Sequence, residues 1–312
     1  MIINAEHSQA ICSFGWVHKG SLWIYRIADK SPRVFELSRA KYLTIKEGRN
    51  DFFSVVHHFD GDQLEISAHS HAEPLQPVSS ISVQRAARPG SKTESKVTGD
   101  PSVWRELPRA YVAFAFASYH LFLIQPCGSI SVQEFAWYTN TDYDKGYQGI
   151  VGVEELPDSQ LLIVLIQRDS HPILYDPGAG AVVRKLNLAE RGGNPRFKLR
   201  ASAAEFWASD YDTILKLDAE TLDVVTSQRL QGSAQSTRHF IGDFSLCRRE
   251  NLCLVPRPFS GDAIGIDCDT MRQTHRANLG KQPLRAGLLG EDRVVALDWK
   301  TGEFLAGTLE QI

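Results

Sequence analysis

The sequence predicts an all-β protein built from repeated antiparallel units. Three observations support this prediction: apolar residues alternate with polar ones along short segments, aspartate-centred turns recur between these segments, and helical periodicity is scarce. The chain has 312 residues, of which 43% are hydrophobic and 23% are charged, as in ordinary globular proteins. We therefore expect a large core of packed strands, with short helical turns only near Ser38–Glu47 and Leu188–Arg191.

The recurring turns are the strongest of these signals. In the second half of the chain, alternating apolar residues lead four times into an aspartate, a short turn and a further apolar segment. The aspartates are Asp176, Asp218, Asp267 and Asp298, and threonine follows three residues later at Thr221, Thr270 and Thr301. An aspartate side chain accepts hydrogen bonds from backbone N–H groups two or three residues on, which stabilises a tight reversal between strands. The four aspartates are therefore predicted to mark hairpin corners.

Hairpins of the form hydrophobic-x-hydrophobic-Asp-x-x-Thr resemble those of β-propellers, whose blades of about four antiparallel strands surround a central channel. Successive corner aspartates are 42, 49 and 31 residues apart, and a blade takes roughly 40 to 50 residues. The resemblance covers the chain from Gly149 onward and implies one propeller domain over residues 1–312, with no subfamily motif recognised. Seven strand clusters predict seven blades: Ile11–Leu37, Asp51–Ser82, Tyr111–Tyr138, and four that begin near Gly149, Arg196, Arg238 and Pro283.

The last interval between corners is shorter than a blade. We therefore expect the Asp298 hairpin to join the second and third strands of its blade, which leaves that blade one strand short. The N-terminal segment Met1–Ala10 is predicted to supply the missing strand and to close the ring, because closure removes exposed sheet edges. The competing architecture is a pair of β-sandwiches with a boundary in Gln84–Leu107.

Residues 84–107 predict a long loop between blades. The segment is rich in small, polar and breaker residues and lacks apolar periodicity, so it is expected to be either mobile or functional. Four basic residues followed by Trp104 suit contacts with phosphates and stacking on a base, which makes residues 84–109 a possible nucleic-acid site. The basic residues are Arg85, Arg88, Lys92 and Lys96.

Aromatic residues in turns are the candidate partner-binding residues: Trp104, Tyr143, Tyr147 and Trp299. Tyr143 and Tyr147 lie among turn formers in residues 137–149, and Trp299 directly follows a corner aspartate. Exposed aromatic side chains commonly anchor protein interfaces. The alternative interpretation is that each ring packs against a neighbouring blade.

Charge and composition exclude several classes of protein. A formal net charge of −3 and a pI near 6.4 provide no overall positive field for nucleic acid or anionic lipid, so nucleic-acid binding is a secondary hypothesis. Five scattered cysteines do not form a disulfide framework. The longest apolar run, Leu161–Ile166, is too short to span a bilayer, and the N-terminus has no secretory signal. These observations predict a cytoplasmic protein without membrane contact.

The sequence contains no strong catalytic or metal-binding motif. His69 and His71 would share one face of a strand, near His57 and His58, but a metal site needs a third ligand that is not evident. We favour an exposed strand face for these histidines, and we predict no metal and no cofactor. P-loop, dinucleotide-binding and Gly-x-Ser-x-Gly motifs are absent.

The function predicted from these features is a non-catalytic scaffold that binds one or more proteins in a cytosolic assembly. A first alternative is a propeller enzyme, a hydrolase, lyase or transferase, that acts on a sugar or small anion at the central channel. Arg200, Arg238 and Arg285 open or precede successive blades and are the candidate anion-binding residues. The second alternative is nucleic-acid binding by residues 84–109.

Overall fold

The structure is a computed structural model. The described residues are 2–4, 9–12, 20–26, 28, 32–40, 42–47, 52–59, 63–84, 96–99, 110–112, 120–124, 130–134, 150–155, 161–166, 173–186, 196–200, 205–218, 220–230, 240–247 and 251–312. No part of these ranges is helical. None of them therefore provides an apolar helix of the length needed to cross a membrane.

The described strands form seven antiparallel sheets, numbered here in chain order. Sheet 1 contains β1 (Ile2–Asn4), β2 (Gln9–Cys12), β3 (Ser21–Arg26) and β4 (Arg33–Glu36). Sheet 2 contains β5 (Tyr42–Glu47), β6 (Phe52–His58), β7 (Gln63–Ser70), β8 (Pro77–Gln84) and β9 (Lys96–Gly99). Sheet 3 contains β10 (Ala110–Val112), β11 (His120–Ile124) and β12 (Ile130–Glu134). Sheet 4 contains β13 (Ile150–Glu155), β14 (Leu162–Ile166), β15 (Ile173–Asp176) and β16 (Ala181–Lys185).

The remaining three sheets lie within residues 196–311. Sheet 5 contains β17 (Arg196–Arg200), β18 (Glu205–Asp210), β19 (Thr213–Leu217) and β20 (Val224–Arg229). Sheet 6 contains β21 (Ser245–Cys247), β22 (Leu252–Arg257), β23 (Asp262–Asp267), β24 (Gln273–Asn278) and β28 (Glu310–Gln311). Sheet 7 contains β25 (Pro283–Leu289), β26 (Arg293–Asp298) and β27 (Phe304–Thr308).

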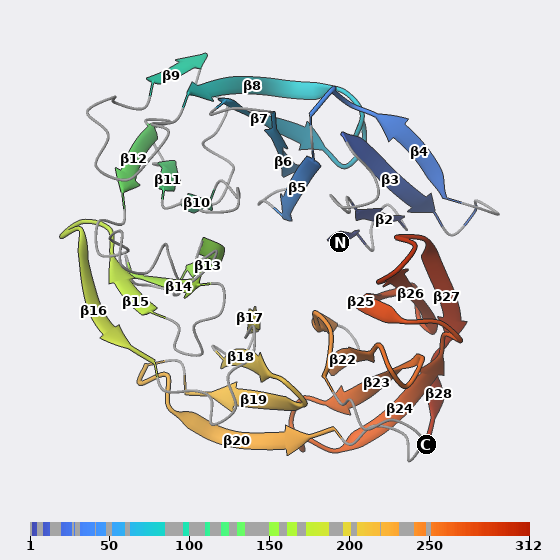
Figure 1. The fold of residues 1–312 in the computed structure, drawn as a ribbon. Coiled ribbons are helices and arrows are strands. Elements are labelled where there is room, and N and C mark those ends of the chain that lie inside the picture. The colour runs from blue at the N-terminus through green and yellow to red at the C-terminus, as the bar shows by residue number, and fades with distance from the viewer. Residues whose placement is uncertain are drawn as a thin grey trace.

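The sheets follow one another around a central axis, with early strands of each sheet toward the centre and later strands toward the rim (Figure 1). This arrangement confirms the predicted all-β propeller and leaves no place for two stacked sandwiches. The number of blades remains a prediction, because the seven sheets are counted over the described residues only. The expected helical turn at Ser38–Glu47 is wrong: residues 38–40 are not helical, and Tyr42–Glu47 pairs with β6 as a strand. Leu188–Arg191 lies outside the described residues.

Apolar clusters fill the spaces between successive sheets. Trp207 and Ile214 of sheet 5 pack against Cys253, Val255 and other residues of sheet 6. Similar clusters join sheets 4 and 5, sheets 6 and 7, and sheets 1 and 2. Because each strand alternates its side chains between two faces, both faces of a sheet are buried against neighbours, and the core is distributed around the ring.

The corner aspartates have the predicted geometry. At all four corners the Oδ1 atom accepts hydrogen bonds from the backbone N–H groups two and three residues later, at 2.7 to 3.2 Å. The fourth residue after each aspartate has a positive φ, and two of these residues are glycines. Leu222 and Met271 occupy the other two, at φ 58°. Their side chains are 3% and 6% exposed in the clusters between sheets, and this burial offsets a backbone cost of about 1–2 kcal/mol.

The fourth corner differs from the first three in its place within the sheet. Asp176, Asp218 and Asp267 each join the third and fourth strands of a sheet, whereas Asp298 joins the second and third described strands of sheet 7. The short interval before Asp298 predicted this difference, which is confirmed. The third–fourth and second–third connections lie at opposite ends of an antiparallel sheet, so the Asp298 corner lies on the other face of the ring.

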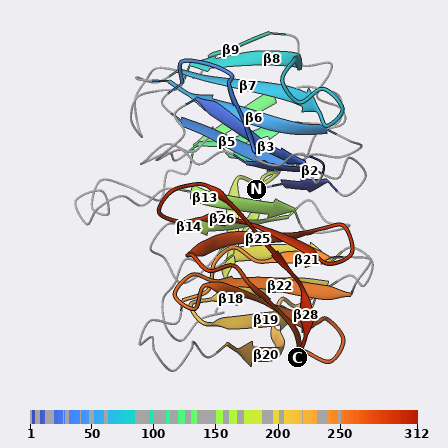
Figure 2. The ribbon, with the colours of Figure 1, turned by 90° about the vertical axis from the view of Figure 1, so that its right-hand side faces the viewer.

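The N-terminal segment closes the ring, but not as a strand of the last blade. β1 pairs with β2 as the first strand of sheet 1, and no described strand of sheet 1 pairs with sheet 7. Figure 2 shows β2 and β3 of sheet 1 beside β25 and β26 of sheet 7. The two sheets meet through side chains, where Ile3 lies against Gly287 and the rings of Tyr25 and Phe304 are 5.6 Å apart. A Cβ atom at position 287 would lie 2.3 Å from Ile3 Cγ1, so this approach requires glycine. The expectation that Met1–Ala10 adds a strand to the last sheet is therefore corrected.

Two sheets carry a fifth strand at their outer edge. β28 pairs with β24 in sheet 6, with Gln311 opposite His275. β9 (Lys96–Gly99) pairs with β8 in sheet 2, within the segment predicted as loop. The loop prediction is corrected for these four residues, because their pairing with the edge strand β8 overrides a sequence that lacks apolar alternation. Residues 85–95 and 100–109 lie outside the described part of the chain.

Candidate functional site

Three turns at one end of the sheets gather aromatic residues on one face of the ring. They join the second and third strands in sheets 5, 6 and 7, at residues 211–212, 258–261 and 299–303. The N–H of Ile241 donates to the carbonyl oxygen of Tyr211 at 2.7 Å, and the N–H of Trp299 donates to that of Gln282 at 2.8 Å. The first bond therefore links the turn of sheet 5 to the segment that leads into sheet 6, and the second positions Trp299 at the end of the β25–β26 hairpin.

The rings of Phe240, Phe259 and Trp299 pack edge to face. Their centroids are 5.3 to 5.8 Å apart, with interplanar angles of 75° to 88°. Each such pair contributes about 0.5–1.5 kcal/mol beyond its buried area. Trp299 nevertheless remains 39% exposed, and Tyr211, adjacent through the Ile241 hydrogen bond, is 43% exposed. We call Tyr211, Phe240, Phe259 and Trp299 the aromatic surface.

Tyr211 has an unfavourable backbone conformation for a tyrosine. Asp210 pairs with Thr213, so Tyr211 and Asp212 alone form the turn between β18 and β19. The φ of Tyr211 is 50°, in a region that glycine adopts far more readily. Such a residue costs on the order of 1 kcal/mol, and strained positions of this kind concentrate at functional sites. The exposed ring therefore occupies a position where glycine would favour folding.

A polar pocket of about 470 Å³ borders the aromatic surface at Phe259. The Lys281 ammonium donates to Glu303 Oε2 at 2.7 Å, which raises the pKa of Lys281 and lowers the pKa of Glu303. Burial raises the pKa of Asp298, but N–H donors from Thr301, Gln282 and Lys300 outweigh burial and leave that pKa below its usual value. The pocket thus presents ionised groups of both signs beside exposed aromatic rings.

A second candidate site is a chain of side-chain hydrogen bonds in and beside sheet 2, which we call the histidine chain. Ser38 Oγ lies 2.8 Å from His57 Nδ1, and His57 Nε2 lies 2.8 Å from Ser67 Oγ. Ser67 Oγ lies 2.8 Å from His69 Nε2, and His69 Nδ1 lies 3.0 Å from the carbonyl oxygen of Pro74. His57, Ser67 and His69 are at most 5% exposed. The expectation of an exposed strand face is therefore wrong.

The Pro74 carbonyl at the end of the histidine chain determines which histidine nitrogens carry protons. The Pro74 carbonyl only accepts, so His69 Nδ1 carries a proton and neutral His69 accepts at Nε2. The donor is the Ser67 hydroxyl, which lies closer to His69 Nε2 (2.8 Å) than to the carbonyl oxygen of Val55 (3.4 Å). By the same reasoning, Ser67 accepts from His57 Nε2–H, and Ser38 donates to His57 Nδ1. Burial, with a contribution from His69, lowers the pKa of His57 to about 4, and burial lowers the pKa of His69 to about 4. Both rings are neutral at pH 7.

The chain leaves these imidazoles poorly suited to metal binding, because both nitrogens of His57 and of His69 already have partners. Among the described side chains, no group of three histidine, cysteine or acidic residues is placed to hold a metal ion. His71 is also buried, with its ring 5.0 Å from that of Phe53. The backbone of His58 is described, but its side chain is not.

The predicted anion-binding residues are only partly visible. Arg285, on the inner strand β25, lies 3.8 Å from Asp243, so a carboxylate partly balances its charge. Arg200 is the last residue of β17, and its side chain is not described. Arg238 lies outside the described residues. A ring of positive charge in the channel therefore stays a prediction.

Of the predicted partner-binding residues, the structure describes Trp299 alone. The Trp299 ring packs against Phe240 and Phe259 and is also partly exposed, so its role in partner binding stays a prediction. Trp104, Tyr143 and Tyr147 lie outside the described residues. The sequence analysis did not identify Tyr211, Phe240 and Phe259 as site residues. The one signal that could have found them is their position as aromatic residues in the turns and connections between strands.

Comparison with known proteins supports the fold. The sequence matches no family model and no curated protein. The structure is similar to the β-propeller domain of Cps50 (Swd1) from Myceliophteria thermophila, with a TM-score of 0.62, 9% identity and coverage of 99% of this chain and 95% of that chain. It is also similar to Sqt1 from Saccharomyces cerevisiae, with a TM-score of 0.54, 8% identity and coverage of 99% and 94%.

A third similar structure is a candidate 6-phosphogluconolactonase from Bacteroides fragilis. Its TM-score is 0.56 at 12% identity, with coverage of 97% of this chain and 93% of that chain. At such identities the three likenesses show the β-propeller fold alone, since one fold serves many unrelated functions.

Proposed function

We propose that this protein is a non-catalytic interaction scaffold in a cytoplasmic assembly, and that its aromatic surface binds a protein partner. The observation that carries the proposal is the exposed Trp299 ring, held edge to face by Phe240 and Phe259. Tryptophan and tyrosine dominate interface hot spots, especially where their orientation is fixed before binding. The adjacent polar pocket supplies charged groups for the rim of an interface.

The strained turn at Tyr211 supports the same proposal. Glycine would remove the backbone cost at this position, and an exposed tyrosine contributes little to the core. A binding role for the ring accounts for a residue that folding alone does not favour.

The enzyme alternative has weaker support among the described residues. Arg285, on an inner strand, is paired with Asp243, and burial raises the pKa of the nearby Cys12 thiol to about 11. A thiol with that pKa is protonated at neutral pH and is a poor nucleophile. Trp104, Tyr143 and Tyr147 remain proposed partner contacts, and nucleic-acid binding by residues 84–109 remains a secondary proposal.

The test replaces the two exposed rings together. Tyr211→Ala/Trp299→Ala should reduce the recovery of specific partners at least tenfold in affinity purification from the native source. A tenfold loss of affinity corresponds to roughly 1.4 kcal/mol of binding free energy, and the loss of two hot-spot rings is expected to exceed that value. Recovery is measured by quantitative mass spectrometry against wild type.

Two controls separate binding from folding. Val183→Ala/Val225→Ala removes two exposed apolar side chains from the outer strands β16 and β20 and should leave recovery unchanged. Tyr211→Gly removes the ring without lowering the free energy of unfolding. Undiminished recovery of every partner by the Tyr211→Ala/Trp299→Ala variant would contradict the proposal.

A further inference from the structure

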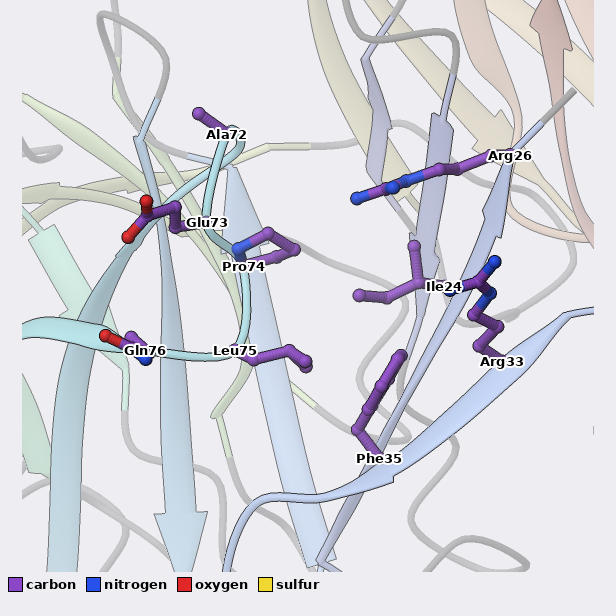
Figure 3. Close-up of a pocket in the computed structure, with 9 residues that line it drawn as sticks. All are labelled: Ile24, Arg26, Arg33, Phe35, Ala72, Glu73, Pro74, Leu75 and Gln76. Carbon is purple, nitrogen blue, oxygen red and sulfur yellow. The ribbon is translucent and has the colours of Figure 1, made fainter. Parts of the chain in front are cut away.

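A second pocket, of about 500 Å³, lies between sheets 1 and 2 (Figure 3). We call it the arginine pocket, and its walls include Ile24, Arg26, Arg33, Phe35, Pro74 and Leu75. It lies where the third and fourth strands of these sheets connect, so it is on the face of the ring opposite the aromatic surface. Its volume is in the usual range for ligand pockets.

Strand alternation explains which side chains reach the pocket. Ile24 and Arg26 are two residues apart on β3, and Arg33 and Phe35 are two residues apart on β4, so each pair shares one face of its strand. Ile24 stands opposite Arg33 in the register. One face of β3 and β4 therefore presents two guanidinium groups beside an apolar floor.

The opposite wall brings no described carboxylate to Arg26. Figure 3 shows Arg26 extending across the pocket toward Ala72 and Pro74, and Leu75 pointing toward Phe35. The Glu73 carboxylate points away from both arginines. Among the described residues, no carboxylate forms an ion pair with Arg26. A ligand that fits this pocket carries a negative group near Arg26 and Arg33 and an apolar group near Phe35 and Leu75.

The wall formed by residues 71–76 is fixed from within the protein. His69 donates to the carbonyl oxygen of Pro74 at 3.0 Å, and Gln9 donates to the carbonyl oxygen of His71 at 2.8 Å. The N–H of Ala72 donates to Ser70 Oγ at 3.2 Å. Pro74 is buried. The loop is therefore held in place before any ligand binds, which reduces the ordering cost of binding.

The outer edge of β4 identifies an extended segment as the ligand. In the described part of the chain, β4 pairs with β3 along one edge and with no strand along the other. Sheets 2 and 6 each accept a fifth antiparallel strand at the corresponding edge, β9 on β8 and β28 on β24. The fold thus already uses this edge for strand addition, and an exposed sheet edge is a common template for peptide binding.

We propose that sheet 1 binds a peptide segment of a partner protein as a fifth strand on β4, with side chains in the arginine pocket. Alternate residues of the added strand face the pocket, so the segment carries an acidic and an apolar residue two positions apart. The acidic side chain lies near Arg33 and Arg26, and the apolar side chain lies near Phe35 and Leu75. Cross-strand pairs of opposite charge and of apolar residues stabilise this register.

The experiment is a selection of random nine-residue peptides displayed on phage against the purified full chain. Enriched peptides should share an acidic-x-apolar or apolar-x-acidic pattern, and their synthetic forms should bind Arg26→Glu/Arg33→Glu at least about tenfold more weakly in fluorescence polarisation. The absence of enrichment, or equal affinity for this variant, would overturn the proposal.

Controls distinguish the pocket from general charge and from the aromatic surface. Arg272→Glu/Arg293→Glu makes the same charge change at exposed arginines of other sheets and should retain binding. Tyr211→Ala/Trp299→Ala should also retain it, so failure of the proposed function leaves this result unaffected. Strand addition is tested with two sets of peptides, N-methylated at the odd or at the even residues. Only one set loses the N–H groups that would bond to β4, so that set should no longer bind. Binding of both sets would contradict strand addition.

Discussion

The second and sixth sheets each contain five antiparallel strands, yet their central strands bury different side chains. In sheet 6, β22 and β23 contribute apolar residues such as Val255 and Ile264 to the space between sheets. In sheet 2, the equivalent strands β6 and β7 bury His57, Ser67 and His69 in the histidine chain. Apolar packing tolerates small changes of shape, whereas a buried polar chain depends on every donor and acceptor having its partner. Two sheets with similar backbones are therefore stabilised differently, sheet 6 by apolar packing and sheet 2 partly by buried hydrogen bonds.

The largest difference is expected from matched valine substitutions in the two sheets. Ser67→Val leaves the His57 Nε2–H donor and the His69 Nε2 acceptor without their shared hydroxyl, and should lower the free energy of unfolding by about 2–5 kcal/mol. Ile264→Val removes one methylene from sheet 6 and should cost about 0.5–1.5 kcal/mol. Urea unfolding at pH 7.5 measures both values. Equal losses would mean that the histidine chain contributes no more than ordinary packing.

The pH dependence of stability should also reside in sheet 2. His57 and His69 have a pKa of about 4 in the folded protein and an ordinary pKa of 6.5 when unfolded. The unfolded chain therefore binds more protons between pH 6.5 and 4, and stability falls as the pH is lowered through this window. Each histidine accounts for about 2 kcal/mol by pH 5.

Replacing both histidines tests this assignment. His57→Gln/His69→Gln should be less stable than wild type at pH 7.5, but its free energy of unfolding should decline less between pH 7.5 and 5. Urea titrations at several pH values provide the comparison. A decline as steep as that of wild type would place the sensitivity elsewhere.

The smallest difference is expected between the Ser38 end of the histidine chain and the Asp267 corner of sheet 6. Ser38→Ala removes the donor to His57 Nδ1 at the partly buried end of the histidine chain and should cost about 0.5–1.5 kcal/mol. Thr270→Ala removes the exposed Thr270 Oγ1 donor, 2.7 Å from Asp267 Oδ1, and should cost only a few tenths of a kcal/mol, because water replaces it. Thermal unfolding resolves the two variants. A larger effect at Thr270 would reverse the order.

The periodic parts of the fold were predictable from the sequence because their causes are local. Alternation of apolar residues sets a strand, and Asp267 with Thr270 sets a corner within four residues. Even the unusual place of Asp298 in its sheet followed from chain spacing. Tyr42–Glu47 was harder, since pairing with β6 overrode the expected helical turn.

The sites were less predictable because their causes are distant in the chain. Alternating polar residues on β7 suggested an exposed face, and the cover over His69 comes from other residues, among them Phe53 on β6, whose ring centroid is 5.4 Å away. The aromatic surface likewise combines turns from three sheets. The manner of ring closure depended on β1 pairing with β2, a choice of register that composition does not determine.

The contact between the first and last sheets has a mechanical consequence. In the described residues, no hydrogen-bonded strand crosses from sheet 1 to sheet 7, and β28 returns to sheet 6. Sheets that follow one another along the chain are also joined by their connecting segments. Among the described residues, sheets 1 and 7 meet through side-chain contacts alone, in the apolar cluster of Ala10, Tyr25, Leu289 and Val295 and at Ile3 against Gly287. When the protein is pulled or heated, the ring is therefore expected to open first between sheets 1 and 7, and the backbone amides next to this contact are expected to exchange hydrogen early.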